Sequence, residues 1–99
     1  MSVNNFMREQ LVAIREIIND MSDTFDSHDF IKKFSKRFEL DYVDLLATAN
    51  SIEPFQTVNK QIGRFLSDNQ TMLRIECMGK INSENVFGNK TKCEKWKKV

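Results

Sequence analysis

The sequence predicts an α+β fold class, a mostly helical domain that ends in a small β-hairpin. Apolar residues recur at helical intervals as far as residue 68, and from residue 71 they alternate with polar residues as in a strand. The chain has 99 residues, of which 40% are hydrophobic, and can therefore bury one modest core. We accordingly expect residues 1–99 to form a single domain.

The first expected element is a helix over residues 3–21, which no glycine or proline interrupts. Its apolar residues follow one another at intervals of three or four. They are Val3, Met7, Leu11, Ile14, Ile18 and Met21. Phe6 and Ile17 widen this stripe, so the helix could enter the core and also contact a partner, for example in a homodimer.

Two shorter helices are expected next, over residues 28–38 and 42–50. Polar residues after the first helix predict a cap for 28–38 at Asp26 or Ser27. Asp41 has the position of a cap before 42–50, where an acidic side chain is favoured by the helix dipole. So few residues separate the two helices that the chain must turn sharply between them.

A fourth helix is expected over residues 55–68, because Pro54 suits the first position of a helix. Its apolar residues have helical spacing and are expected to point inward. They are Phe55, Val58, Ile62, Phe65 and Leu66. Gly63 weakens a helix, so we expect it to permit the close approach of another element.

The chain then changes to a strand period, and we expect a hairpin of strands over residues 71–81 and 86–96. The polar residues 82–85 separate the two strands, and Gly79 and Gly88 suggest bulges or tight approaches. A two-stranded hairpin is marginally stable alone, so it should lie against the helices.

Charge is distributed unevenly along the chain, although the net charge is only +1. Residues 1–59 hold six basic and ten acidic residues, a net of −4, whereas residues 60–99 hold nine basic and four acidic residues, a net of +5. Such asymmetry is typical of an oriented polyanion binder. Five of those nine cations lie in the last ten residues, however, so a solvated tail is the alternative interpretation.

Short helices joined by a sharp turn, then a helix, then a hairpin with a polar tip, resemble the winged helix-turn-helix family over about residues 25–98. The resemblance implies that helix 55–68 is a recognition helix and that residues 80–92 form the wing. Thr24 and Phe25 would supply the short strand that the family places after its first helix.

The outward face of helix 55–68 carries amides, a hydroxyl and two cations. Amides can pair with adenine and threonine can contact a thymine methyl, whereas cations suit phosphates. The candidate DNA-binding residues of this helix are Gln56, Thr57, Asn59, Lys60, Gln61 and Arg64. Those of the wing are Lys80, Asn82, Ser83, Lys90 and Lys92. The plainer alternatives are an amphipathic helix with a neutral polar face and an ordinary hairpin turn.

The expected function is that of a small duplex-DNA-binding protein, a transcriptional or mobile-element regulator. The alternative is a winged-helix protein-interaction module without DNA binding, which would use the wide apolar stripe of helix 3–21. No long apolar run and no secretory signal are visible, so we expect a cytoplasmic protein without membrane contact.

Enzyme chemistry and cofactors are not expected, because no catalytic motif and no paired metal-ligand cluster occurs. His28 is the only histidine, and with Cys77 and Cys93 it falls short of the four ligands that a structural zinc site needs. Local capping accounts for the aspartates beside His28. The two cysteines are expected to be free thiols, unless paired strands place them opposite each other.

Overall fold

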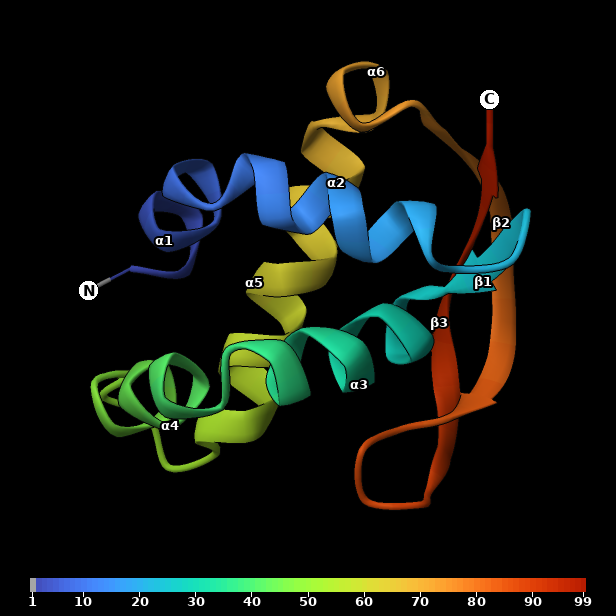
Figure 1. The fold of residues 1–99 in the computed structure, drawn as a ribbon. Helices are drawn as coiled ribbons and strands as arrows, with labels where there is room; N and C mark the ends of the chain where they lie inside the picture. Colours follow the sequence, from blue (N-terminus) through green and yellow to red (C-terminus); the bar gives the residue numbers. More distant parts are fainter. Residues whose placement is uncertain (1) are drawn as a thin grey trace.

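The structure, a computed structural model that describes residues 2–99, is an α+β fold with an antiparallel sheet at one end of a helical body (Figure 1). The described helices are α1 (Val3–Glu9), α2 (Leu11–Asn19), α3 (Ser27–Arg37), α4 (Glu39–Ala47), α5 (Pro54–Asp68) and α6 (Gln70–Leu73). The strands β1 (Thr24–Asp26), β2 (Ile75–Glu84) and β3 (Lys90–Lys98) form a sheet in the order β1-β3-β2. The predicted fold class is confirmed, and this order is compatible with a winged-helix topology. Within residues 2–99, no helix combines the length and the apolar character that crossing a bilayer requires.

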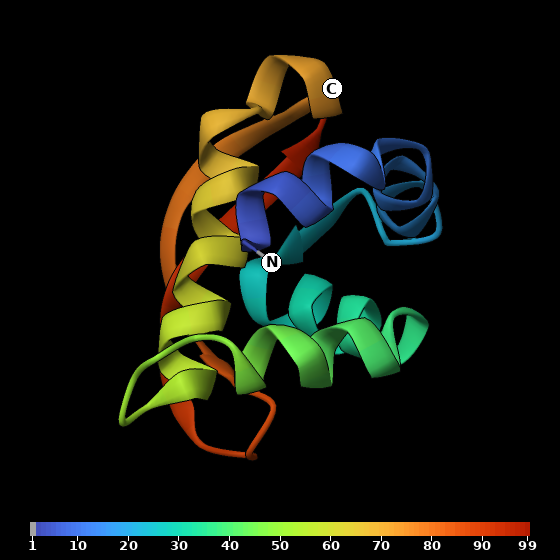
Figure 2. The same ribbon diagram turned by 90° about the vertical axis from the view of Figure 1, so that its left-hand side faces the viewer.

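The prediction of one helix over residues 3–21 is wrong, because the chain leaves the helical backbone at Gln10, where φ is −108° and ψ is 26°. The two resulting helices run in different directions, and α1 packs against α5 whereas α2 packs against α3 (Figures 1 and 2). Phe6 and Ile17 are buried in the core. The apolar stripe on which the predicted dimer rested is therefore not on the surface, and Val12, 76% exposed, is the large apolar side chain of α2 that faces solvent.

A capping box starts α3 one residue before the predicted position. Asp26 Oδ1 accepts a hydrogen bond from the backbone N–H of Asp29 at 2.8 Å, and Asp29 Oδ2 accepts one from the N–H of Asp26 at 3.3 Å. Helix α4 begins at Glu39 and not at residue 42, so Asp41 lies in its first turn and the predicted cap there is wrong. The sharp turn between α3 and α4 is confirmed, because Phe38 alone separates them.

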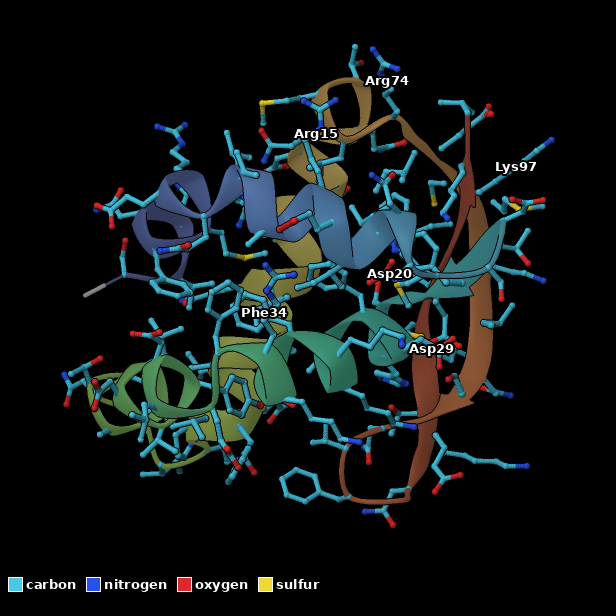
Figure 3. All side chains as sticks on the ribbon, viewed as in Figure 1. Arg15, Asp20, Asp29, Phe34, Arg74 and Lys97 are labelled. Atoms are coloured by element: carbon cyan, nitrogen blue, oxygen red, sulfur yellow. The ribbon has the colours of Figure 1, made fainter. Side chains whose placement is uncertain are left out.

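An aromatic cluster joins the helices in the core. Phe34, labelled in Figure 3, is fully buried. Its ring lies 6.1 Å from that of Phe6, 5.3 Å from that of Phe38 and 6.4 Å from that of Tyr42. These centroid separations are favourable for edge-to-face and tilted ring pairs. Helices α1, α3 and α4 therefore share one core.

Strand β3 is the central strand and fixes the sheet to the helices. Its Trp96 is fully buried, pairs with Phe25 of β1 and donates a hydrogen bond from Nε1 to Ser27 Oγ at 2.9 Å. The short strand expected at Thr24 and Phe25 is thereby confirmed. Trp96 leaves no face for a nucleic-acid base, because its ring belongs to the core.

The hairpin begins and turns later than predicted. Residues 70–73 form α6, Arg74 adopts a left-handed conformation, and β2 starts at residue 75. A bulge follows Cys77, where Gly79 has φ of +103°, and the connecting turn spans residues 85–89. Cys77 lies opposite Trp96 and not opposite Cys93, which explains why both cysteines are free thiols.

Candidate functional site

A groove with a volume of about 620 Å³ lies between α5 and the hairpin. Figure 2 shows α5 and the hairpin along the same side of the molecule. One wall comes from α5, the other from β2, β3 and the turn that joins them, and the start of α3 contributes to the floor. The groove is therefore built from the helix and the hairpin that the sequence analysis expects to contact DNA.

Four cations from three elements line this groove. Lys60 and Arg64 come from α5, Lys80 from β2 and Lys92 from β3, and all four are exposed. Glu94 is the one acidic residue among the side chains described along the groove. Converging cations in a concave surface produce a positive potential that attracts polyanions.

An aromatic pair links the two walls of the groove. The ring of Phe55 at the start of α5 lies 4.8 Å from that of Phe87 in the hairpin turn, at an interplanar angle of 81°. Phe55 is 38% exposed, so its predicted place in the core is wrong. The other four apolar residues expected to point inward are confirmed as buried. They are Val58, Ile62, Phe65 and Leu66. No sequence signal pointed to Phe87, because its contact depends on how the turn folds back.

The candidate base-reading residues of α5 do not share one surface. Gln56 and Asn59 line the groove, whereas Thr57 and Gln61 do not. Thr57 donates a hydrogen bond from Oγ1 to Ser51 Oγ at 2.9 Å, in the loop before α5. Because Thr57 and Gln61 lie away from the groove, the predicted single reading face is split into two.

Asn59 is engaged within the chain, since its Oδ1 accepts a hydrogen bond of 2.6 Å from the hydroxyl of Tyr42. Burial raises the pKa of Tyr42 above 10.0. The phenol therefore stays neutral and holds one side of the Asn59 amide. The amide nitrogen of Asn59 is what remains for a ligand in the groove.

Only some of the predicted DNA-binding residues of the hairpin line the groove. Lys80 and Lys92 line the groove, but the other three do not, and they belong to the paired strands and not to the tip. Asn82 lies opposite Lys92, Ser83 opposite Thr91, and Lys90 opposite Glu84. The prediction of a tip at residues 82–85 is wrong, because the strands pair as far as residue 84.

Gly63 forms part of the groove wall. A Cβ atom built at Gly63 would meet nothing within 4 Å, so the expected close approach of another element is wrong. Gly63 therefore borders the groove and does not pack against another element.

Three potential metal ligands gather at the floor of the groove. A carboxylate oxygen of Asp26, a ring nitrogen of His28 and Sγ of Cys93 all lie within 4.8 Å of one another. Burial raises the pKa of the Cys93 thiol, although the backbone of His28 opposes this shift in part. Sequence reasoning missed the cluster because β3 comes from the far end of the chain, and only the pairing of β1 with β3 brings its members together.

Comparison of the chain with protein-family models, with curated proteins and with solved structures gives no match. The groove is therefore interpreted from the chemistry of its own residues. Cations and amides dominate the polar groups that line it, a combination that suits phosphates and the edges of bases.

Proposed function

We propose that this protein binds duplex DNA and acts as a small regulator of the winged-helix type. The observation that carries the proposal is the convergence of Lys60, Arg64, Lys80 and Lys92 on one groove between α5 and the hairpin. These cations come from distant parts of the chain, so local sequence composition does not account for their meeting. Four cations that each neutralise a phosphate would supply a large share of the affinity for DNA.

The cations of α5 are exposed and can contact phosphates. Arg64 is paired with Asp68 at 3.7 Å, but both side chains are mostly exposed, and such surface pairs are worth little. The ion pair can therefore be exchanged for a phosphate at low cost. Gln56 lines the groove and Gln61 is exposed on α5 outside it, so both amides remain open to base edges of a duplex that covers the outer face of this helix.

The acidic residues of the chain favour one orientation on DNA. Glu39, Asp41 and Asp44 lie on α4, which contributes nothing to the groove wall. A duplex that approached α4 would meet these carboxylates, whereas one that approaches α5 and the hairpin meets the cations. The uneven charge along the chain therefore works as an orientation signal in the folded protein.

The test is a fluorescence-anisotropy titration of labelled duplex DNA over a series of salt concentrations. We expect binding that weakens with salt, and the double variant Lys60→Ala with Arg64→Ala should lower the slope of log K against log salt by about 0.9 for each phosphate that the variant no longer neutralises. The matched control is Lys33→Ala with Lys36→Ala, which removes the same charge from exposed positions of α3 outside the groove.

Two results would contradict the proposal. One is the absence of binding to any duplex at low salt, and the other is an equal loss of affinity in the groove variant and in the control.

Base reading by Gln61 has a separate test. Gln61→Ala should reduce the preference for one sequence over random DNA while leaving the salt slope unchanged, because an amide carries no charge that a phosphate could neutralise. Equal weakening on specific and random DNA would exclude base reading by Gln61.

A second candidate function is that of a protein-interaction module. Leu40, 82% exposed, and Val43 lie one turn apart on α4 and present apolar side chains to solvent. Under this alternative, a protein partner copurifies with the chain after nuclease treatment and high salt, and Leu40→Glu removes it. Loss of the partner on nuclease treatment would instead favour the DNA proposal.

A further inference from the structure

A cluster of three ligand types lies beneath the groove, at the junction of β1, α3 and β3. The ligand atoms of Asp26, His28 and Cys93 are all within 4.8 Å of one another. In a tetrahedral zinc site with bond lengths of about 2.0 to 2.3 Å, neighbouring ligand atoms are about 3.5 Å apart. Side-chain adjustments on the order of 1 Å would therefore close the cluster around an ion.

The imidazole of His28 has one nitrogen that the described residues leave without a partner. Nδ1 is buried and makes no hydrogen bond within residues 2–99, whereas Nε2 lies 3.3 Å from Thr91 Oγ1. Buried polar atoms are seldom left unpaired. If Nε2 carries the proton and donates it to Thr91, the lone pair of Nδ1 is free, and this is the arrangement that a metal-binding histidine adopts.

Asp26 is held in place by the structure around it. Its backbone pairs with Lys95 in the sheet, and its Oδ1 accepts the N–H of Asp29 in the capping box. A carboxylate has further acceptor positions beyond this one hydrogen bond. Cys93 is half-buried on β3 and lines the groove, so its sulfur is partly shielded from solvent.

We propose that Asp26, His28 and Cys93 bind one Zn²⁺ ion, with a water molecule in the fourth position. Carboxylate, imidazole and thiolate together are a ligand set that zinc accepts, and hard cations such as Mg²⁺ do not favour thiolate. The thiolate and the carboxylate carry two negative charges, which balance the charge of Zn²⁺. The partial positive charge at the nearby start of α3 therefore does not repel the loaded site. His28 and Cys93 line the groove, so the water position faces it.

The ion would tie β3 to the start of α3. The sequence argued against a structural zinc site, because it offers one histidine and two cysteines with no short spacing between them. A site with three protein ligands and a water molecule needs no fourth side chain. The inference of a zinc site does not rest on the proposed DNA binding, and its test needs no nucleic acid.

The experiment titrates the chelator-treated full chain with Zn²⁺ by calorimetry and with Co²⁺ by absorption spectroscopy. We expect one ion per chain and a thiolate-to-cobalt charge-transfer band. Cys93→Ser should abolish the band, whereas the matched control Cys77→Ser, which changes the other free cysteine, should retain it. His28→Gln and Asp26→Asn should weaken Zn²⁺ binding by tenfold or more.

The variants are chosen so that the fold survives. Asparagine is as good a helix cap as aspartate, so Asp26→Asn keeps the start of α3 while removing the charge. Circular dichroism of each variant before metal addition checks that the helices are retained. The proposal is overturned if the folded wild-type chain binds no Zn²⁺ at micromolar concentrations, or if Cys77→Ser and Cys93→Ser have equal effects on the cobalt band.

Discussion

At the scale of single residues, the hydroxyl of Tyr42 links α4 to α5. It donates a hydrogen bond of 2.6 Å to Asn59, and the phenol ring is buried beside Phe34. The hydrogen bond fixes the Asn59 amide at the wall of the groove. A buried hydroxyl of this kind contributes about 0.5 to 1.5 kcal/mol to folding stability.

The environment of Tyr42 predicts a specific loss of stability at alkaline pH. Its pKa is raised above the unfolded value of 10.0 by burial, so the stability that comes from the neutral phenol is complete below about pH 10 and is lost as pH rises through the folded-state pKa. Tyr42 is the only tyrosine, so tyrosinate absorbance reports its ionisation directly. We expect a midpoint above 10.0 in the folded protein.

The matched variant is Tyr42→Phe, which keeps the ring and removes the ionisable hydroxyl. Urea unfolding at neutral pH should show a destabilisation of about 0.5 to 1.5 kcal/mol. The variant should also lose less folding stability at alkaline pH than the wild type, because it has no phenol to ionise. A tyrosinate midpoint at or below 10.0 in the folded wild type would contradict the burial of this hydroxyl.

At the scale of single elements, Gly63 and Gly79 both have open surroundings but differ in backbone conformation. A Cβ atom at Gly63 or at Gly79 would meet nothing within 4 Å, so steric overlap does not distinguish them. Gly63 lies in the interior of α5, whereas Gly79 lies in the bulge of β2 with φ of +103°. Only the second backbone conformation requires glycine.

The two alanine substitutions should therefore change stability in opposite directions. Gly63→Ala should stabilise the protein by about 0.4 to 1 kcal/mol, because alanine favours the helix and restricts the unfolded chain. Gly79→Ala should destabilise it by more than about 1 kcal/mol, because its φ is strained for any residue with a Cβ. Urea unfolding of both variants makes the comparison, and destabilisation by Gly63→Ala would mean that the helix interior is more crowded than the structure indicates.

At the scale of the whole molecule, β3 connects the end of the chain to its core. It pairs with β1 on one edge and with β2 on the other, and its Trp96 is the largest fully buried side chain. Trp96 Nε1 donates a hydrogen bond to Ser27 Oγ at the start of α3. The last residues therefore stabilise the whole domain and are not a solvated tail.

Truncation of this side chain should cost a large part of the stability. We expect Trp96→Ala to lower the free energy of unfolding by about 3 to 5 kcal/mol, against a total of about 5 to 15 kcal/mol for a typical domain. The control is Phe87→Ala, an aromatic truncation at an exposed position, which should cost about 1 kcal/mol or less. Thermal unfolding followed by circular dichroism measures both, and similar losses would show that Trp96 is not a core residue.

The sequence alone determined the elements whose signals are local. The buried residues of α5 follow from helical spacing, the start of α3 from the capping signal at Asp26, and the bulge in β2 from Gly79. Each of these signals depends on residues within a few positions of one another, so the pattern predicts the backbone directly.

Only the tertiary structure decided the features that join distant segments. The break at Gln10 separates two helices that pack against different helices, and Phe55, outside the core, meets Phe87 of the hairpin turn. The basic groove and the cluster of Asp26, His28 and Cys93 likewise form only when β3 lies against β1 and α3. Periodicity and capping carry no information about contacts between residues far apart in the chain, and the candidate sites of this protein consist of such contacts.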